Sequence, residues 1–146
     1  MLIFFTGVDC SGKDSIRHAL SESCNYEPFI SSRSPICNIV YDVIFERITN
    51  QRLNNNEILI KNLLKLNAYF VLITVDPEIL IARAKARNEK HVNDLKTFKE
   101  HQKIFITVFS ELKESFKQYE NQFIEVSNSK TLNDVVKKIK RKIKWM

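Results

Sequence analysis

The sequence predicts an α/β fold in which a parallel sheet of about four to five strands carries helices on both faces. Three apolar runs, LIFFT (2–6), AYFVLITVD (68–76) and QFIEVS (122–127), are each typical of a buried strand. The segments between them place apolar residues at helical spacing. Strands that alternate with helices pair in parallel, because each helix carries the chain back to the same end of the sheet.

The expected elements follow one another without a long gap. The first half contains a strand at 2–6, a helix at 13–23, a short strand at 27–30, a loop at 31–35, a helix at 36–49, a loop or mobile insertion at 50–56 and a helix at 57–66. The second half adds a strand at 68–76, a helix at 77–90, a largely helical stretch at 94–119, a strand at 122–127 and a final helix after Thr131. Pro35 and Pro77 stand where proline favours a first helical turn, and Thr131 is a typical helix cap.

The totals predict one domain over residues 1–146, with no internal repeat and no linker. No apolar run approaches the roughly 20 residues that span a bilayer, so we expect no membrane partner and a cytoplasmic protein. The apolar start at 1–5 is short and lacks a basic flank, so it is interpreted as a strand and not as a signal peptide. Cys10, Cys24 and Cys37 have no metal-site spacing, and reduced thiols are expected.

The formal net charge of +6 is concentrated at one end of the chain. The last ten residues, KKIKRKIKWM, hold six Lys or Arg and no acid, which leaves 17 basic and 17 acidic residues elsewhere. One interpretation is the solvated face of a final helix, with Ile139 and Ile143 turned inward. The other is contact with the phosphate backbone of DNA.

One motif carries most of the functional information. GVDCSGKDS (7–15) has the pattern G-x-x-x-x-G-K between a predicted strand and a predicted helix, which is the context of a phosphate-binding loop for ATP. Gly7 and Gly12 are the only glycines in the chain, and glycine is required where backbone approaches a phosphate closely. The loop N–H groups bind phosphate oxygens, and Lys13 binds the β- and γ-phosphates. The residues expected to bind the nucleotide are Gly7, Cys10, Ser11, Gly12, Lys13, Asp14 and Ser15.

The residue after the lysine departs from the usual pattern. A Ser or Thr is expected there to bind Mg²⁺, and this chain has Asp14. Either Asp14 binds the metal directly or through water, or its negative charge stabilises the N-terminus of the helix through the helix dipole while Ser15 binds the metal. A third alternative is a loop that has lost its activity.

GVDCSGKDS resembles the G-x-D-x-x-G-K signature of thymidylate kinases and related P-loop nucleotide kinases. An Asp after the lysine is similar to that of some viral deoxynucleoside monophosphate kinases. The resemblance implies the three-layer P-loop NTPase fold, ATP and Mg²⁺ as cofactors, and a position for Asp9 near the sugar and phosphate of the acceptor.

A second stretch, SSRSPICNIVYD (31–42), resembles the Asp-Arg segment of thymidylate kinases and the Glu-Arg-Ser segment of deoxynucleoside kinases. By this resemblance Arg33 binds the acceptor phosphate or steadies the transferring one, and arginine suits such bidentate binding. The alternative is a surface arginine. The family's acidic residue before this arginine is Ser32 here, so its role passes to Asp9 or Asp14, or is lost.

A third stretch, ARAKARNEK (82–90), resembles the arginine-bearing lid of nucleotide kinases. Arg83 and Arg87 are four residues apart and share a helix face, whereas Lys85 points elsewhere. The resemblance makes these two arginines catalytic residues of a lid at roughly 83–100 that closes over the phosphates. The alternative is a solvated basic helix. Asp76 ends a strand just before Pro77 and is interpreted as structural.

These observations predict an ATP-dependent kinase that transfers the γ-phosphate to a deoxynucleotide in nucleotide metabolism. Only 20 residues separate Lys13 from Arg33, so the part that encloses the acceptor base in the family is trimmed. The trimmed site either holds a small deoxynucleotide, with a homodimer surface completing it, or is open to a hydroxyl on DNA or on a hydroxymethylated pyrimidine within it. A nucleotide-binding protein without kinase activity is a further alternative. High Asn, Lys and Ile usage indicates an AT-rich genome, such as a viral one.

Overall fold

The computed structural model describes residues 1–8, 11–23, 28–86 and 95–143. Its elements are β1 (Leu2–Thr6), α1 (Lys13–Glu22), β2 (Phe29–Ser31), α2 (Pro35–Ile44), α3 (Asn50–Lys65), β3 (Tyr69–Thr74), α4 (Pro77–Ala86), α5 (Leu95–Ser115), the 3₁₀ helix η2 (Lys117–Gln122), β4 (Phe123–Ser127) and α6 (Leu132–Lys142). The strands form one sheet in the order β2-β1-β3-β4, and each neighbouring pair is parallel. The predicted parallel sheet is therefore confirmed with four strands.

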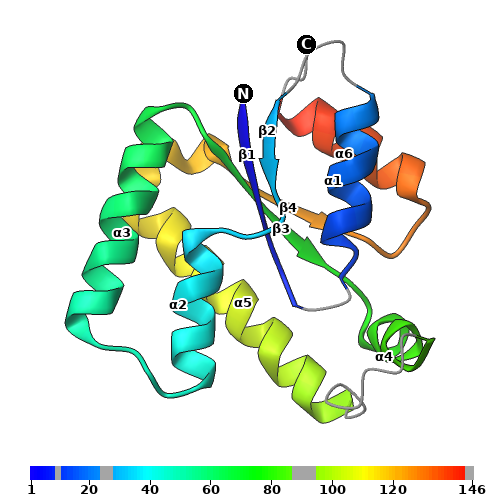
Figure 1. The fold of residues 1–146 in the computed structure, drawn as a ribbon, viewed down its shortest axis with the longest axis horizontal. Helices are drawn as coiled ribbons and strands as arrows, with labels where there is room; N and C mark the ends of the chain where they lie inside the picture. The colour runs from blue at the N-terminus through cyan, green and yellow to red at the C-terminus, as the bar shows by residue number, and fades with distance from the viewer. Residues whose placement is uncertain (9–10, 24–27, 87–94, 144–146) are drawn as a thin grey trace.

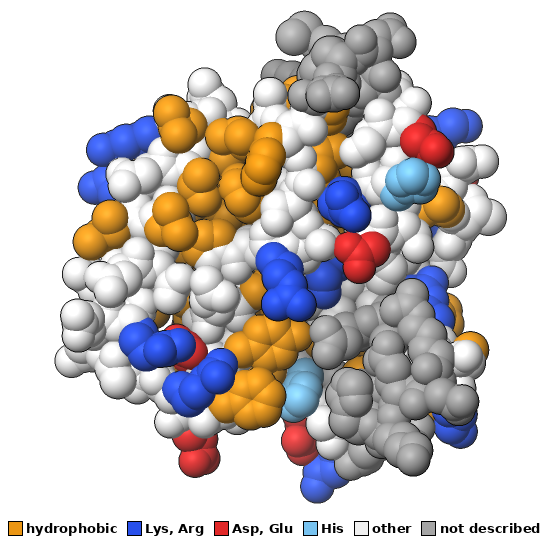
Figure 2. Space-filling model, viewed as in Figure 1, with side chains coloured by type: hydrophobic (Ala, Val, Ile, Leu, Met, Phe, Trp, Pro, Cys, Tyr) orange, Lys and Arg blue, Asp and Glu red, His pale blue; other side chains and the backbone are white. Residues whose placement is uncertain are grey.

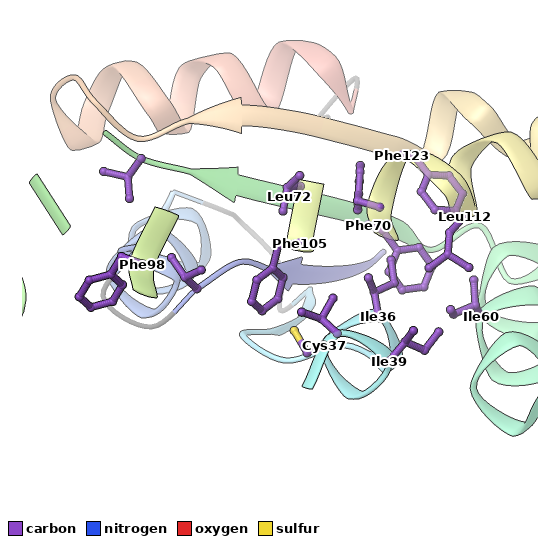
Figure 3. Close-up of a cluster of buried hydrophobic side chains, with 14 of the residues drawn as sticks. Ile36, Cys37, Ile39, Ile60, Phe70, Leu72, Phe98, Phe105, Leu112 and Phe123 are labelled. Carbon is purple, nitrogen blue, oxygen red and sulfur yellow. The ribbon is translucent and has the colours of Figure 1, made fainter. Parts of the chain in front are cut away.

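Helices cover both faces of this sheet, so the fold has the three layers that the sequence predicts. Figure 1 shows α1 and α6 on one side, and α2, α3 and α5 on the other. Ile3 and Phe5 of β1 pack with Ile16 and Leu20 of α1 on the first side. Phe70 belongs to the cluster on the second side, which Figure 3 shows reaching Phe123 and the helices below the sheet.

The boundary between the second and third helices differs from the prediction. The loop expected at 50–56 is wrong, because α3 begins at Asn50. Thr49 caps this helix by accepting a hydrogen bond from the backbone N–H of Arg52 (3.1 Å). The helix expected at 36–49 ends earlier, at Ile44, and Glu46 then takes a positive φ of 54° in the turn.

The remaining boundaries agree closely with expectation. The helical stretch predicted at 94–119 is α5 followed by η2, and the helix predicted at 77–90 is described as far as Ala86. In α6, Thr131 caps the helix, and Ile139 and Ile143 are buried as predicted. None of the helices in the described ranges is long and apolar enough to cross a membrane.

A buried carboxylate joins α2 to α3. Asp42 lies on α2 with its side chain only 2% exposed, and it accepts hydrogen bonds from Arg52 Nε (2.9 Å) and Nη2 (2.7 Å). Arg47 Nε lies 3.5 Å from the same carboxylate. The Arg52 hydrogen bonds are the main cause of the lowered pKa of Asp42, with the charges of Arg52 and Arg47 adding to it against the opposing effect of burial. This pair holds the start of α3 against α2, where the sequence alone suggests a loop.

We expect Asp42→Asn to lower the melting temperature at pH 7. Because the pKa of Asp42 is lower in the folded state, its ionised form stabilises the fold above the unfolded value of about 3.9. That stabilisation is lost as the pH falls through the folded pKa. The melting-temperature difference between wild type and Asp42→Asn is therefore constant above about pH 5 and shrinks below about pH 4. Thermal melts across pH measure it, with exposed Glu111→Gln as the control. A constant difference down to the lowest pH at which the wild type is folded would contradict the account.

Candidate phosphate-binding site

The glycine motif forms the connection between β1 and α1, at the carboxyl end of the central strands. Gly7 follows β1 directly, and a side-chain carbon on it would lie 2.6 Å from the Ile73 carbonyl oxygen of β3. Gly12 ends the loop as the N-cap of α1 with φ of 91°, a left-handed conformation that favours glycine. Both glycines are therefore required by the backbone, as the sequence predicts.

Lys13 bends back over this loop. Its Nζ donates hydrogen bonds to the carbonyl oxygens of Gly7 (2.6 Å) and Val8 (3.0 Å). The ammonium group thus lies above the loop backbone at the start of α1, where the positive end of the helix also favours an anion. The structure thus brings Lys13, Gly7 and Gly12 together at the start of α1.

Asn128 packs against the loop at Ser11 and Gly12, a contact that the sequence analysis did not predict. It follows β4, is 5% exposed, and donates from Nδ2 to the Ser11 carbonyl oxygen (2.7 Å). Its backbone N–H donates to the Thr74 carbonyl oxygen (2.7 Å), which fixes it to the end of β3. A side-chain carbon on Gly12 would collide with the Asn128 amide. A loop near the start of the chain is therefore held by a residue 117 positions further along the sequence.

Arg83 reaches the same loop from α4. Its Nη1 would lie 3.5 Å from a side-chain carbon on Gly12, so the guanidinium is beside the phosphate loop. The helix is positioned by Asp76, whose Oδ1 accepts a hydrogen bond from the backbone N–H of Glu78 (3.0 Å). Asp76 is thus a cap of α4, in agreement with its predicted structural role. Lys85 of the same helix is exposed.

Gln102 of α5 holds the connection between β3 and α4. Its Oε1 accepts from the Val75 backbone N–H (3.0 Å), and its Nε2 donates to the Val75 carbonyl oxygen (2.8 Å). Val75 immediately precedes Asp76, so the amide fixes the point at which the chain leaves β3 for α4. The contact lies two residues before the start of α4, the helix that carries Arg83.

Arg33 follows β2 and lies next to a residue that touches the base of the loop. Ser34 Oγ and Thr6 Oγ1 are 2.7 Å apart in a buried hydrogen bond, and Thr6 immediately precedes Gly7. Ser34 also caps α2 by accepting from the Cys37 backbone N–H (3.3 Å). Arg33 itself is exposed, and Ser32 is half-buried. Arg33 thus lies two residues beyond the carboxyl end of β2.

An open groove of about 470 Å³ extends from Arg33 along the sheet edge. Its lining residues are Leu2, Phe4, Phe29, Arg33, Ser34, Pro35, Asn38, Leu59 and Leu63. Figure 2 shows hydrophobic side chains gathered between α3 and the β1–β2 edge, where this groove lies. Phe29 is 56% exposed there, with its ring 5.9 Å from that of Phe4. The groove therefore has the Arg33 guanidinium at one end and the rings of Phe4 and Phe29 along its wall.

Asp14 and Ser15 both lie in the exposed first turn of α1. The Asp14 carboxylate is 3.8 Å from Arg17 Nε, an exposed pair within the helix. Mg²⁺ prefers oxygen ligands and keeps several waters, so a carboxylate and a hydroxyl beside the phosphate loop fit this ion. Of the other predicted site residues, Asp9, Cys10 and Arg87 lie outside the described residues.

The sequence matches no protein-family model and no curated protein at a significant level. Several solved structures share its fold, among them those of three different proteins. The YorR protein from Bacillus subtilis, in complex with phosphorylated GDP, is 18% identical, with TM-score 0.69 and coverage of 99% of this chain and 96% of that chain. A gluconokinase from Sinorhizobium meliloti 1021 is 14% identical, with TM-score 0.57 and coverage of 98% and 91%.

The third structure is the deoxyadenosine kinase from M. mycoides with bound dCTP, which is 16% identical, with TM-score 0.54 and full coverage of both chains. These likenesses extend over nearly the whole chain. The chain therefore has the three-layer α/β fold of P-loop kinases, as the sequence predicts.

We expect Gly7→Ala to destabilise the protein, because the added carbon meets the Ile73 carbonyl at 2.6 Å and the β3 backbone has to shift. Overpacking of this kind costs about 1–3 kcal/mol of unfolding free energy. Urea unfolding measures the loss. Ser21→Ala on the exposed side of α1 is the control and is expected to change stability by less than about 0.5 kcal/mol. Equal stability of Gly7→Ala and wild type would contradict the close approach of the loop to β3.

Proposed function

We propose that the protein is an ATP-dependent phosphotransferase that moves the γ-phosphate of ATP to a deoxynucleotide acceptor. The observation that carries the proposal is the convergence of Lys13 and Arg83 on a loop whose two glycines have no room for a side chain. Phosphoryl transfer demands positioning and neutralisation of charge rather than covalent chemistry by the protein. Two cations beside a helix N-terminus suit that demand.

Each residue has a defined role in this proposal. Lys13 exchanges its carbonyl partners for the β- and γ-phosphates, and Arg83 neutralises the charge that develops on the transferring group. Arg33 binds the acceptor phosphate, and Asp9 orients the acceptor. Arg87 assists from the lid. Asp14 or Ser15 holds Mg²⁺, which when bound neutralises charge on the phosphate oxygens.

The acceptor class is supported by the groove and by two of the similar structures. A nucleotide would bind with its phosphate toward Arg33, because the guanidinium and the phosphate attract each other. YorR was solved with a guanine nucleotide and the deoxyadenosine kinase with a deoxynucleotide. The resemblance of the glycine loop to thymidylate kinases favours a deoxynucleoside monophosphate.

A second candidate function is phosphorylation of a hydroxyl on DNA or on a hydroxymethylated pyrimidine within DNA. It is favoured by α6, on which Lys137, Lys138, Arg141 and Lys142 are all exposed. The open groove beside Arg33 also leaves room for an acceptor larger than a nucleotide. DNA contact through α6 would weaken steeply with added salt, because phosphate contacts release counterions.

The experiment that tests the function is transfer from γ-labelled ATP with Mg²⁺ to a panel of acceptors. The panel contains each deoxynucleoside monophosphate, single- and double-stranded DNA, and DNA with hydroxymethylated pyrimidine. We expect label on a deoxynucleoside monophosphate, and a loss of at least about 100-fold in kcat/KM for Lys13→Ala. Arg83→Ala and Lys85→Ala form a matched pair on α4, and only the first is expected to slow transfer.

The other outcomes separate the alternatives. Label found only on DNA, with a steep salt dependence, would replace the deoxynucleotide kinase by the DNA-directed one. ATP binding without transfer to any acceptor would leave a nucleotide-binding protein. Equal activity of Lys13→Ala and wild type would overturn the assigned site.

A further inference from the structure

We propose that Asn128 is a positioning residue that orients the Ser11–Gly12 peptide of the loop for phosphate binding. The proposal rests on the proposed function, since it concerns the same loop. It assigns to a buried amide 117 residues away the task of orienting one peptide of the loop. Asn128 lies outside the glycine motif at 7–15.

The geometry at the Ser11–Gly12 peptide carries the argument. Asn128 Nδ2 donates to the Ser11 carbonyl oxygen at 2.7 Å, and Ser11 is 1% exposed. In a planar trans peptide the C=O and the following N–H point in opposite directions. When Asn128 holds the carbonyl on its own side, the Gly12 N–H is directed away from Asn128. That N–H belongs to the set that binds phosphate oxygens in such loops.

The fixed position of the amide comes from the sheet. The backbone N–H of Asn128 donates to the Thr74 carbonyl oxygen, directly after β3 and β4 end side by side. The neighbouring Ser129 Oγ accepts from the Asp76 backbone N–H (3.4 Å), which ties the same turn to the start of α4. The backbone that carries the donor amide is thus fixed to the ends of β3 and β4.

The Asn128 amide also occupies the space that a side chain at position 12 would need. A side-chain carbon on Gly12 would collide with Asn128 Nδ2, and it would lie 3.5 Å from Arg83 Nη1. The second glycine of the motif is therefore required both by its φ of 91° and by the amide that packs against it. Asn128 and Arg83 both approach the loop at Gly12. Loss of the Asn128 amide would therefore also alter the surroundings of the Arg83 guanidinium.

The test measures ATP affinity by calorimetry in the presence of Mg²⁺, without acceptor, on the full chain. Asn128→Ala removes the donor, and Asn128→Asp keeps the shape while placing an acceptor against the Ser11 carbonyl. We expect both variants to bind ATP about tenfold more weakly than wild type. The reason is that the Ser11 carbonyl loses the hydrogen bond that orients the Ser11–Gly12 peptide, and with it the Gly12 N–H that binds phosphate. Asn133→Asp is the matched control, since Asn133 is exposed on α6. Its ATP affinity is expected to equal that of wild type.

The pH dependence of Asn128→Asp is a readout that a purely structural role would not move. As the pH falls, the new carboxyl group takes up a proton and its O–H can donate to the Ser11 carbonyl again. The ratio of variant to wild-type Kd is therefore expected to decrease toward one as the pH falls. Using the ratio removes the titration of ATP itself, which affects both proteins equally.

The contrary results are distinct. Thermal melts identify a temperature at which every variant is folded, and binding is compared there. Variants that melt earlier but bind ATP within about twofold of wild type would overturn the positioning role while leaving the proposed function intact. A wild-type protein that does not bind ATP would overturn both.

Discussion

The arrangement of the site depends on the close approach of the glycine loop to the ends of β3 and β4. Gly7 passes the Ile73 carbonyl with no room for a side chain, and Gly12 does the same beside Asn128. Tight packing at these two glycines restricts the backbone at both ends of the loop, which favours N–H groups that are oriented before a ligand arrives. Preorganised donors of this kind stabilise a phosphate more than donors that must first rearrange.

The rest of the fold brings two cations to this loop and a third to the groove at the edge of the sheet. Lys13 comes from α1, Arg83 comes from α4, and Arg33 follows β2. Polar contacts fix the chain near the carboxyl ends of the strands, among them the Thr6–Ser34 hydrogen bond and the Gln102–Val75 pair. The carboxyl ends of parallel strands are the usual ligand crevice of α/β folds.

The layers of the fold and the phosphate loop were predictable, because apolar periodicity and the glycine motif are local signals. Two features were not. The helix over Asn50–Lys65 begins in a polar stretch without apolar periodicity, and the Asp42–Arg52 pair that stabilises its start is a contact between helices. Asn128 contacts Ser11 across 117 residues, and an isolated Asn after a strand carries no local signal for such a contact.

The central claim is that the loop binds the phosphates of ATP, and the glycine content of the chain allows a direct test. Gly7 and Gly12 are the only glycines, so protein labelled with ¹⁵N-glycine gives two backbone amide signals by NMR, both from the loop. Titration with ATP and Mg²⁺ is predicted to shift both signals, and to shift them far less in Lys13→Ala. Two signals that stay unchanged at saturating ATP in the wild type would contradict the account.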